Sequence, residues 1–182
     1  MKAWGIVALL SVGCLPNPQS VKERREGFDR SGLNESFILS ELPQDVAPVG
    51  TIFEGAIELV GTRIDPPEPR PGQAIRVEYF WRVLRPFARD MKVFIHGDAL
   101  EGDARRIHGD HWPAEGRYPT GVWQAGEIIR DPFTLRVPSD YGPPKLGLYS
   151  GLYRGKDRLD ITEKGRVNAS ADDRALAVEI RF

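Results

Sequence analysis

The sequence predicts an all-β protein: an immunoglobulin-like antiparallel β-sandwich of seven or eight strands, formed by residues 51–182. Two observations lead to this fold class. Short runs in which apolar and polar residues alternate recur along the chain, and an alternation with a period of two is typical of a half-buried strand. The 15 prolines and 19 glycines stand largely between these runs, where they favour turns. Short strands separated by such turns are typical of a sandwich.

The clearest strand is expected at residues 75–83. Its alternate residues from Ile75 to Val83 are apolar or aromatic, and most residues between them are charged. Phe80 interrupts the polar face, so we expect part of that face to be covered. One or two helical turns are expected at residues 36–42. The remaining strands are expected at residues 52–60, 91–96, 105–108, 131–137, 146–153, 158–162 and 176–182.

The length and charge of the chain limit its partners. A chain of 182 residues fits one domain with a leader and a tether. Its 25 basic and 26 acidic side chains nearly cancel, so no overall field favours nucleic acid or an anionic surface. We therefore expect no nucleic-acid partner. The only cysteine is Cys14, which excludes an intramolecular disulfide.

Residues 1–13 are typical of a signal peptide. Lys2 gives a basic start, and the apolar run over residues 3–12 is too short to span a bilayer as a helix. The run ends at the lone Cys14, although Ser11 stands where lipoprotein signals prefer leucine. The leader resembles the lipobox of bacterial lipoproteins, which implies that Cys14 is lipidated, with palmitate among the acyl groups. A plain secretory signal and a buried N-terminal strand are the alternatives.

Residues 14–50 are expected to form the lipidated cysteine and a tether. Residues 16–30 are polar and charged, which is typical of a solvated linker. Leu15 follows the cysteine, whereas aspartate in that place retains the enteric lipoproteins that this leader resembles in the inner membrane. We therefore expect a cell-envelope protein that is anchored by lipid in the outer membrane, on its periplasmic or surface face.

Several residues of the domain come in an order that is familiar from a known module: residues 81–86, 93–96, Asp110, 116–120, 123–127, Asp131, Leu135, Pro138 and 151–153. Over residues 52–182 the chain resembles the β-sandwich that follows the membrane part of bacterial glycosyltransferases of the dolichyl-phosphate-mannose-mannosyltransferase type. The resemblance includes no catalytic motif and no counterpart of the polytopic transferase portion. It implies an extracytoplasmic sandwich beside glycan chemistry, as a binding or assembly module.

Aromatic and polar residues between positions 109 and 127 are the candidate ligand-binding site. Aromatic faces stack on the C–H faces of sugars, and neighbouring polar groups bond the hydroxyls. The alternative interpretation is that the tryptophans fill the ends of the sandwich and that Glu127 caps loop amides or pairs with an arginine. The candidate residues are Trp112, Tyr118, Trp123, Asp110 and Glu127.

The three histidines raise the question of a metal site. His96, His108 and Asp110 are weak candidates for Zn²⁺ ligands, because the spacing of His108 and Asp110 is not a standard one. The alternative is that these residues bind no metal and belong to a solvated loop, with His96 at the end of a strand. We therefore expect no cofactor. The chain has no Gly-x-Ser-x-Gly elbow and no phosphate-binding glycine loop.

These observations favour a non-enzymatic envelope lipoprotein whose sandwich binds glycan or an envelope protein partner. One alternative is a structural subunit of an export, secretion or motility complex that uses a sheet edge or face as its interface. The other is a metal-dependent hydrolase that uses His96, His108 and Asp110. A hydrolase built on a pair of carboxylates is a further, weaker hypothesis.

Overall fold

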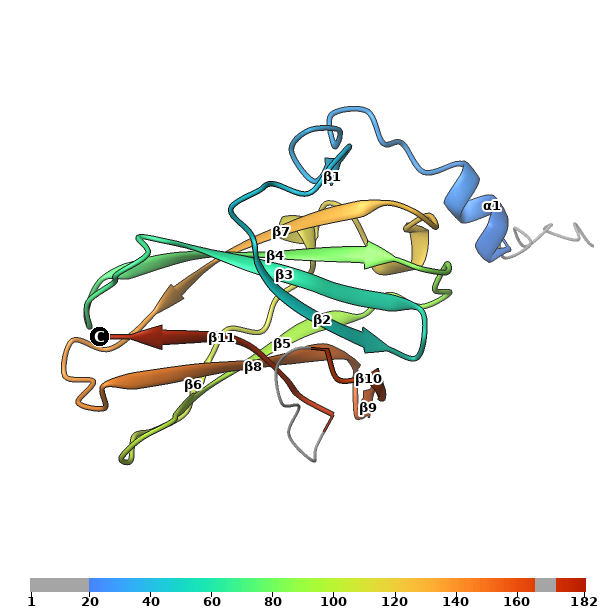
Figure 1. Cartoon of the computed structure of the whole chain (residues 1–182). Helices are drawn as coiled ribbons and strands as arrows, with labels where there is room; N and C mark the ends of the chain where they lie inside the picture. Colours follow the sequence, from blue (N-terminus) through green and yellow to red (C-terminus); the bar gives the residue numbers. More distant parts are fainter. Residues whose placement is uncertain (1–19, 166–172) are drawn as a thin grey trace, which may run out of the picture.

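The structure, a computed structural model, describes residues 20–165 and 173–182, and it confirms the predicted sandwich (Figure 1). Two antiparallel sheets pack face to face. Sheet A has the strand order β1-β7-β4-β3-β2-β10, and sheet B has the order β11-β8-β5-β6, with β9 paired to β8. The strands of sheet A are β1 (Ile38–Leu39), β2 (Ala47–Phe53), β3 (Ile57–Asp65), β4 (Ala74–Val83), β7 (Ile128–Arg136) and β10 (Ile161–Glu163). Those of sheet B are β5 (Lys92–Ala99), β6 (Ile107–His108), β8 (Lys145–Arg154), β9 (Asp157–Arg158) and β11 (Ala175–Arg181).

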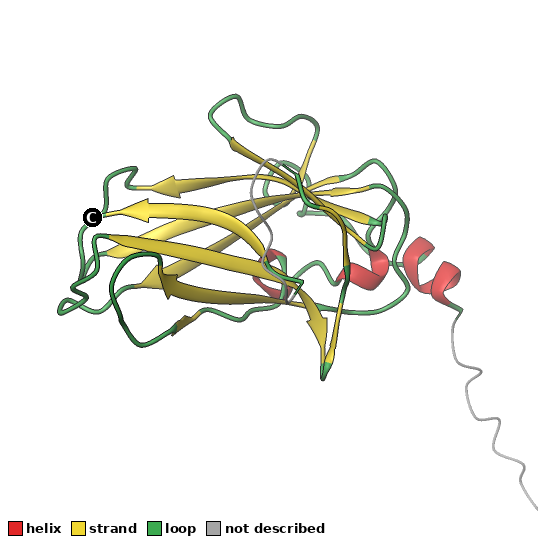
Figure 2. Cartoon of the chain, turned by 60° about the horizontal axis from the view of Figure 1, so that its bottom comes forward, coloured by secondary structure: helices red, strands yellow, loops and turns green. Residues whose placement is uncertain are grey.

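The helices are short, and the red segments of Figure 2 mark them: one precedes the first strand, and the other two lie in the connection between β6 and β7. They are α1 (Val21–Glu26) and the 3₁₀ turns η1 (Ala114–Gly116) and η2 (Thr120–Val122). In the described part of the chain, no helix is long and apolar enough to cross a membrane.

The number of strands is higher than the sequence predicted. The described residues contain eleven strands, of which seven have seven or more residues. Five of the long strands, β4, β5, β7, β8 and β11, correspond one to one to predicted strands, and the predicted strand at 105–108 contains β6. The strands β1, β6, β9 and β10 have two or three residues each, which is too short for an alternating pattern to identify fully. The predicted strand at 158–162 is in fact divided between β9 and β10.

The predicted strand at 52–60 was wrong, because the chain reverses in its middle. Glu54 and Gly55 have φ values of 47° and 58°, and the amide of Ala56 donates to the carbonyl of Phe53 at 2.9 Å. Two successive left-handed residues form the tight turn that matches the twist of a hairpin. The stretch is therefore the end of β2, a two-residue turn and the start of β3.

Residues 20–50 are not the free tether that the sequence predicted. Leu33 and Phe37 are buried in the core, β1 pairs with β7, and β2 begins at Ala47. Residues 21–26, which lie in the stretch where a linker was expected, form the helix α1. Ser20 and Glu23 form a capping box at its start. Residues 36–42, predicted as helical turns, contain β1 instead. The predicted signal peptide and Cys14 lie outside the described residues.

The core lies between the sheets and is rich in aromatic side chains. Trp81, Trp123, Tyr79, Tyr118 and Phe53 are fully buried there. The prediction that the face around Phe80 is covered is confirmed, because its ring is 0% exposed and the guanidinium of Arg63 lies 5.9 Å from its centroid. Aromatic surface is thus buried on both sides of β4, by the opposite sheet on the inner side and under the Arg63 side chain on the outer side.

Replacing Gly55 by alanine is expected to lower the free energy of unfolding by about 1–2 kcal/mol, because a side chain at positive φ is strained even where space is free. Gly142→Ala is the matched control. A Cβ there also meets nothing within 4 Å, but the φ of Gly142 is not in the left-handed region. Urea unfolding of the two variants measures the difference, and equal stabilities would contradict the assigned turn.

Candidate functional site

A buried carboxylate organises the segment that leads from β6 to β7. Asp131 of β7 is 0% exposed and lies on the inner face of sheet A. Its Oδ2 accepts from the indole N–H of Trp81 at 3.2 Å and lies 3.1 Å from Nε2 of His111, while its Oδ1 accepts from the amide of Ala114 at 2.9 Å. The carboxylate therefore ties the two strands β4 and β7 to residues 111–114.

The surroundings of His111 favour its doubly protonated form. Its Nδ1 lies 2.9 Å from the carbonyl oxygen of Gly109, and its Nε2 faces Asp131. Both neighbours are acceptors, so both ring nitrogens need a hydrogen. Burial alone would lower the pKa of His111, but the Asp131 carboxylate outweighs it and the pKa is raised above 6.5. The imidazolium supplies the countercharge that a buried carboxylate requires.

The main chain of His111 joins sheet B. Its amide donates to the carbonyl of Val93 at 3.0 Å, and the amide of Val93 donates to the carbonyl of His111 at 2.9 Å. Adjacent residues of an extended chain point to opposite sides. Since His111 points inward to Asp131, Asp110 and Trp112 project from the outer face of sheet B. Trp112 is 48% exposed and Asp110 is exposed.

Trp112 lies at one end of a series of rings on the outer face of sheet B, which we call the aromatic row: Trp112, Tyr153, Phe94, His96 and His108. The ammonium of Lys92 lies 5.7 Å from the centroid of Trp112 and 6.0 Å from that of Tyr153. Successive centroids are then 6.2 Å apart for Tyr153 and Phe94, 5.0 Å for Phe94 and His96, and 5.3 Å for His96 and His108. The row is continuous across β8, β5 and β6.

Polar groups border the aromatic row. Asp110 accepts from the amide of Ile95 at 3.0 Å, and together with burial its hydrogen bond with Tyr153 raises the pKa of that phenol. Arg158 covers the ring of Phe94 at 4.7 Å, which explains why this outward-facing phenylalanine is only 2% exposed. The face thus combines apolar ring surface with a carboxylate, an ammonium and a guanidinium.

His96, His108 and Asp110, the weak metal candidates, do come together. Each offers a ligand atom, and these atoms all lie within 4.8 Å of one another. Burial and the neighbouring Arg106 lower the pKa of His96, which favours the neutral imidazole that metals bind. His111 is not part of this group, because both of its ring nitrogens are used inside the sandwich.

The other predicted ligand-binding residues do not join this face. Tyr118 and Trp123 are 0% exposed, and the indole N–H of Trp123 donates to the carbonyl of Tyr118 at 3.0 Å. The phenol of Tyr118 donates to Glu127 at 2.7 Å and accepts from Arg30 at 3.1 Å, and burial followed by Glu127 raises its pKa. Their burial corresponds to the alternative interpretation, in which these residues close one end of the sandwich and offer no ring face to a ligand.

Lys92, Phe94 and Tyr153 were not among the predicted site residues. The alternation in β8 did indicate aromatic side chains at Tyr149 and Tyr153 on its second face. Their meeting with Trp112 depends on the pairing of Lys92 with Tyr153 between β5 and β8. This pairing joins positions that lie far apart in the chain, and no local pattern reveals it.

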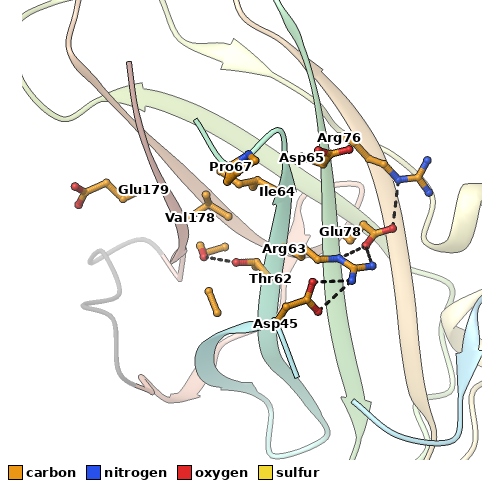
Figure 3. Close-up of a pocket in the computed structure, with 12 residues that line it drawn as sticks. Asp45, Thr62, Arg63, Ile64, Asp65, Pro67, Arg76, Glu78, Val178 and Glu179 are labelled. Atoms are coloured by element: carbon orange, nitrogen blue, oxygen red, sulfur yellow. Dashed lines mark hydrogen bonds and ion pairs between the residues drawn. The ribbon is translucent and has the colours of Figure 1, made fainter. Parts of the chain in front are cut away.

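A groove of about 720 Å³ lies between β3 and β4 of sheet A and the edge of β11 (Figure 3). Its charged groups already bind one another: Figure 3 shows Arg63 between Glu78, at 2.5 Å, and Asp45, at 3.0 Å. Burial raises the pKa of Glu78, but Arg63, Arg130 and Arg76 outweigh it, and the pKa is lowered. The hydroxyl of Thr62 also donates to the edge of β11. The groove therefore offers a ligand few unused polar groups.

Comparison with known proteins leaves the function open. No family model matches the chain, and no curated protein matches it either. Among solved structures it is similar to the C-terminal domain of Wzt, with a TM-score of 0.47 and 15% identity, over 76% of this chain and 78% of that one. At this identity and score, the likeness says nothing about ligand or activity. The predicted resemblance to the glycosyltransferase module stays a prediction.

The ion pair of His111 and Asp131 predicts a pH dependence. The stabilisation by His111 should be fully present below the unfolded-state pKa of about 6.5 and should be lost as the pH rises through the raised pKa of the folded state. The free energy of unfolding of the native chain minus that of His111→Gln should thus be larger at about pH 5.5 than at about pH 8.5. Urea unfolding measures both. His108→Gln, which does not contact Asp131, should keep the pH dependence of the native chain, and a difference that grows with pH would contradict the imidazolium.

Proposed function

We propose that the chain is a non-enzymatic carbohydrate-binding β-sandwich, and that the glycan lies along the aromatic row on the outer face of sheet B. The observation that supports this most is the exposure of Trp112. An indole that leaves 48% of its surface in water forgoes much of the stabilisation that burial would give. Such a ring on a rigid sheet is a surface on which a pyranose can stack.

The neighbours of Trp112 fit the polar part of a sugar. Lys92, between Trp112 and Tyr153, can donate hydrogen bonds to sugar hydroxyls, and Asp110, beside Tyr153, can accept them. Ammonium and carboxylate groups next to an aromatic face fix the orientation of hydroxyl groups, whereas the ring supplies apolar contact that is tolerant of their stereochemistry.

The position of these groups also favours a preorganised site. Lys92, Phe94 and His96 lie on β5, and Tyr153 lies on the paired strand β8. Asp110 and Trp112 flank His111, which Asp131 holds inside the sandwich. Groups on paired strands lose little freedom on binding, so less of the interaction energy is spent on ordering them. The alternatives of a structural subunit and a metal-dependent hydrolase stay predictions.

Trp112→Ala is expected to weaken glycan binding several-fold, up to about tenfold, because aromatic contacts contribute on the order of 0.5–1.5 kcal/mol beyond simple area. Immobilised bacterial envelope polysaccharides serve as the probe, and calorimetry with the one that binds gives the affinity. Leu84→Ala is the matched control, since Leu84 is 42% exposed but lies at the end of β4 in sheet A. It should bind like the native chain. The proposal fails if no polysaccharide binds, or if Trp112→Ala binds as tightly as Leu84→Ala.

We further propose that a lipid on Cys14 holds this sandwich at the cell envelope, in the outer membrane. The lone cysteine directly after the apolar run of residues 3–12 supports this, because a free thiol is a liability in an oxidising compartment and acylation removes it. Acyl chains then supply the membrane affinity.

The native chain is expected to have the intact mass of a protein cleaved before Cys14 and acylated, and to sediment with membranes. Cys14→Ser should keep the leader uncleaved or leave the protein without acyl chains, and it should lose membrane retention by lipid. Mass spectrometry and fractionation of both forms measure this. An unmodified native chain that begins at Met1 would refute the anchor and leave the glycan site untouched.

A further inference from the structure

We propose that His96, His108 and Asp110 bind one divalent transition-metal ion, with Zn²⁺ as the ion that their donor atoms fit well. The strand register brings the three side chains together. His96 of β5 and His108 of β6 are direct partners in the antiparallel pair. Directly opposite residues on one face of such a pair have Cβ atoms about 4.5–5.5 Å apart.

Asp110 joins the histidines through the same register. It lies two residues beyond His108, and the bridge between Val93 and His111 shows that the pairing continues past it. Residues two apart on an extended chain share a face. Two imidazoles and a carboxylate thus lie on one face of two adjacent strands, which is a rigid base for a metal site.

The distances suit a tetrahedral ion. The ligand atoms lie within 4.8 Å of one another in the structure. Bonds of about 2.0–2.1 Å to Zn²⁺ require ligand atoms about 3.4 Å apart, so small side-chain rotations close the site. Three protein ligands leave the fourth position open to water or to a ligand, as in zinc sites that are not purely structural.

The hydrogen bonds of the three residues leave this role open. Nδ1 of His96 is buried and has no hydrogen-bond partner, and a buried polar atom of this kind calls for an unseen partner such as an ion. Asp110 accepts from the amide of Ile95 at Oδ1 and is also hydrogen-bonded to Tyr153, and these contacts hold its carboxylate within 4.8 Å of the histidine ligand atoms. The nearby cation Arg106 is paired with Asp98 at 2.5 and 2.9 Å, which offsets its repulsion of a metal ion.

The metal site shares a surface with the proposed glycan site, because His96 and His108 belong to the aromatic row and Asp110 borders it. Trp112 lies at the other end of the row and is not one of the three ligands. Trp112→Ala therefore tests glycan binding without removing a metal ligand, and Zn²⁺ binding is measured with no glycan present. The site also needs no third histidine, since His111 is bound to Asp131 and Gly109 inside the sandwich.

Calorimetric titration of the chain, prepared without a histidine tag, with Zn²⁺ should show one equivalent bound. His108→Gln and Asp110→Asn should each weaken binding by at least about tenfold. Asp103→Asn, which changes another exposed carboxylate of the same connection, should bind like the native chain. The proposal is overturned if Zn²⁺ does not bind, or if Asp110→Asn binds as tightly as Asp103→Asn.

A second measurement needs no substitution. The chain has three histidines, so their ring signals can be resolved by nuclear magnetic resonance. Zn²⁺ should shift the ring signals of His96 and His108 at one equivalent and leave those of His111 in place. Shifts at His111 alone, or at none of the three, would refute the site even if the variants fail to fold.

Discussion

The hydrogen-bonded ion pair of Asp131 and His111 is the interaction on which the rest of the structure depends. The carboxylate has no exposure to solvent, so it is tolerable only because an indole, an amide and an imidazolium surround it. Removing one partner of a buried pair leaves an uncompensated charge and costs about 3–5 kcal/mol. Because Asp131 belongs to sheet A and His111 pairs with β5 of sheet B, the ion pair also fixes the two layers to each other.

The same interaction decides which side chains reach the surface. With His111 committed to the interior, the residues on either side of it must point outward. A shift of the segment by one residue would place Trp112 in the core and His111 in solvent. The exposed indole, the carboxylate of Asp110 and the pairing of His96 with His108 are thus consequences of one buried contact. The buried contact between His111 and Asp131 therefore determines which side chains this segment presents on the outer face of sheet B.

The fold was predictable from sequence to the extent that its pattern is local. Alternation identified the long strands β4, β5, β7, β8 and β11, and the capping box at Ser20 and Glu23 was available as a signal for α1. The turn at Glu54 was not, because glutamate is uncommon in a left-handed conformation and tertiary pairing imposes it. Trp112 and Trp123 look alike in sequence, yet one is half exposed and the other fully buried. The exposure of Trp112 follows from the inward direction of its neighbour His111, and that direction depends on a contact with a distant strand.

The packing of residues 20–50 changes how far the sandwich can stand from a surface to which Cys14 is attached. A free chain from Cys14 to Gly50 would have a maximum reach of about 120–130 Å. Since α1 begins directly after Ser20 and Arg24 binds Asp90 at 2.6 Å, only six residue steps separate Cys14 from the docked part of the chain, and they span at most about 20 Å. If Cys14 is lipidated, the sandwich would stay close to the bilayer. It would then meet polymers that lie at the membrane surface, rather than those that extend far from it.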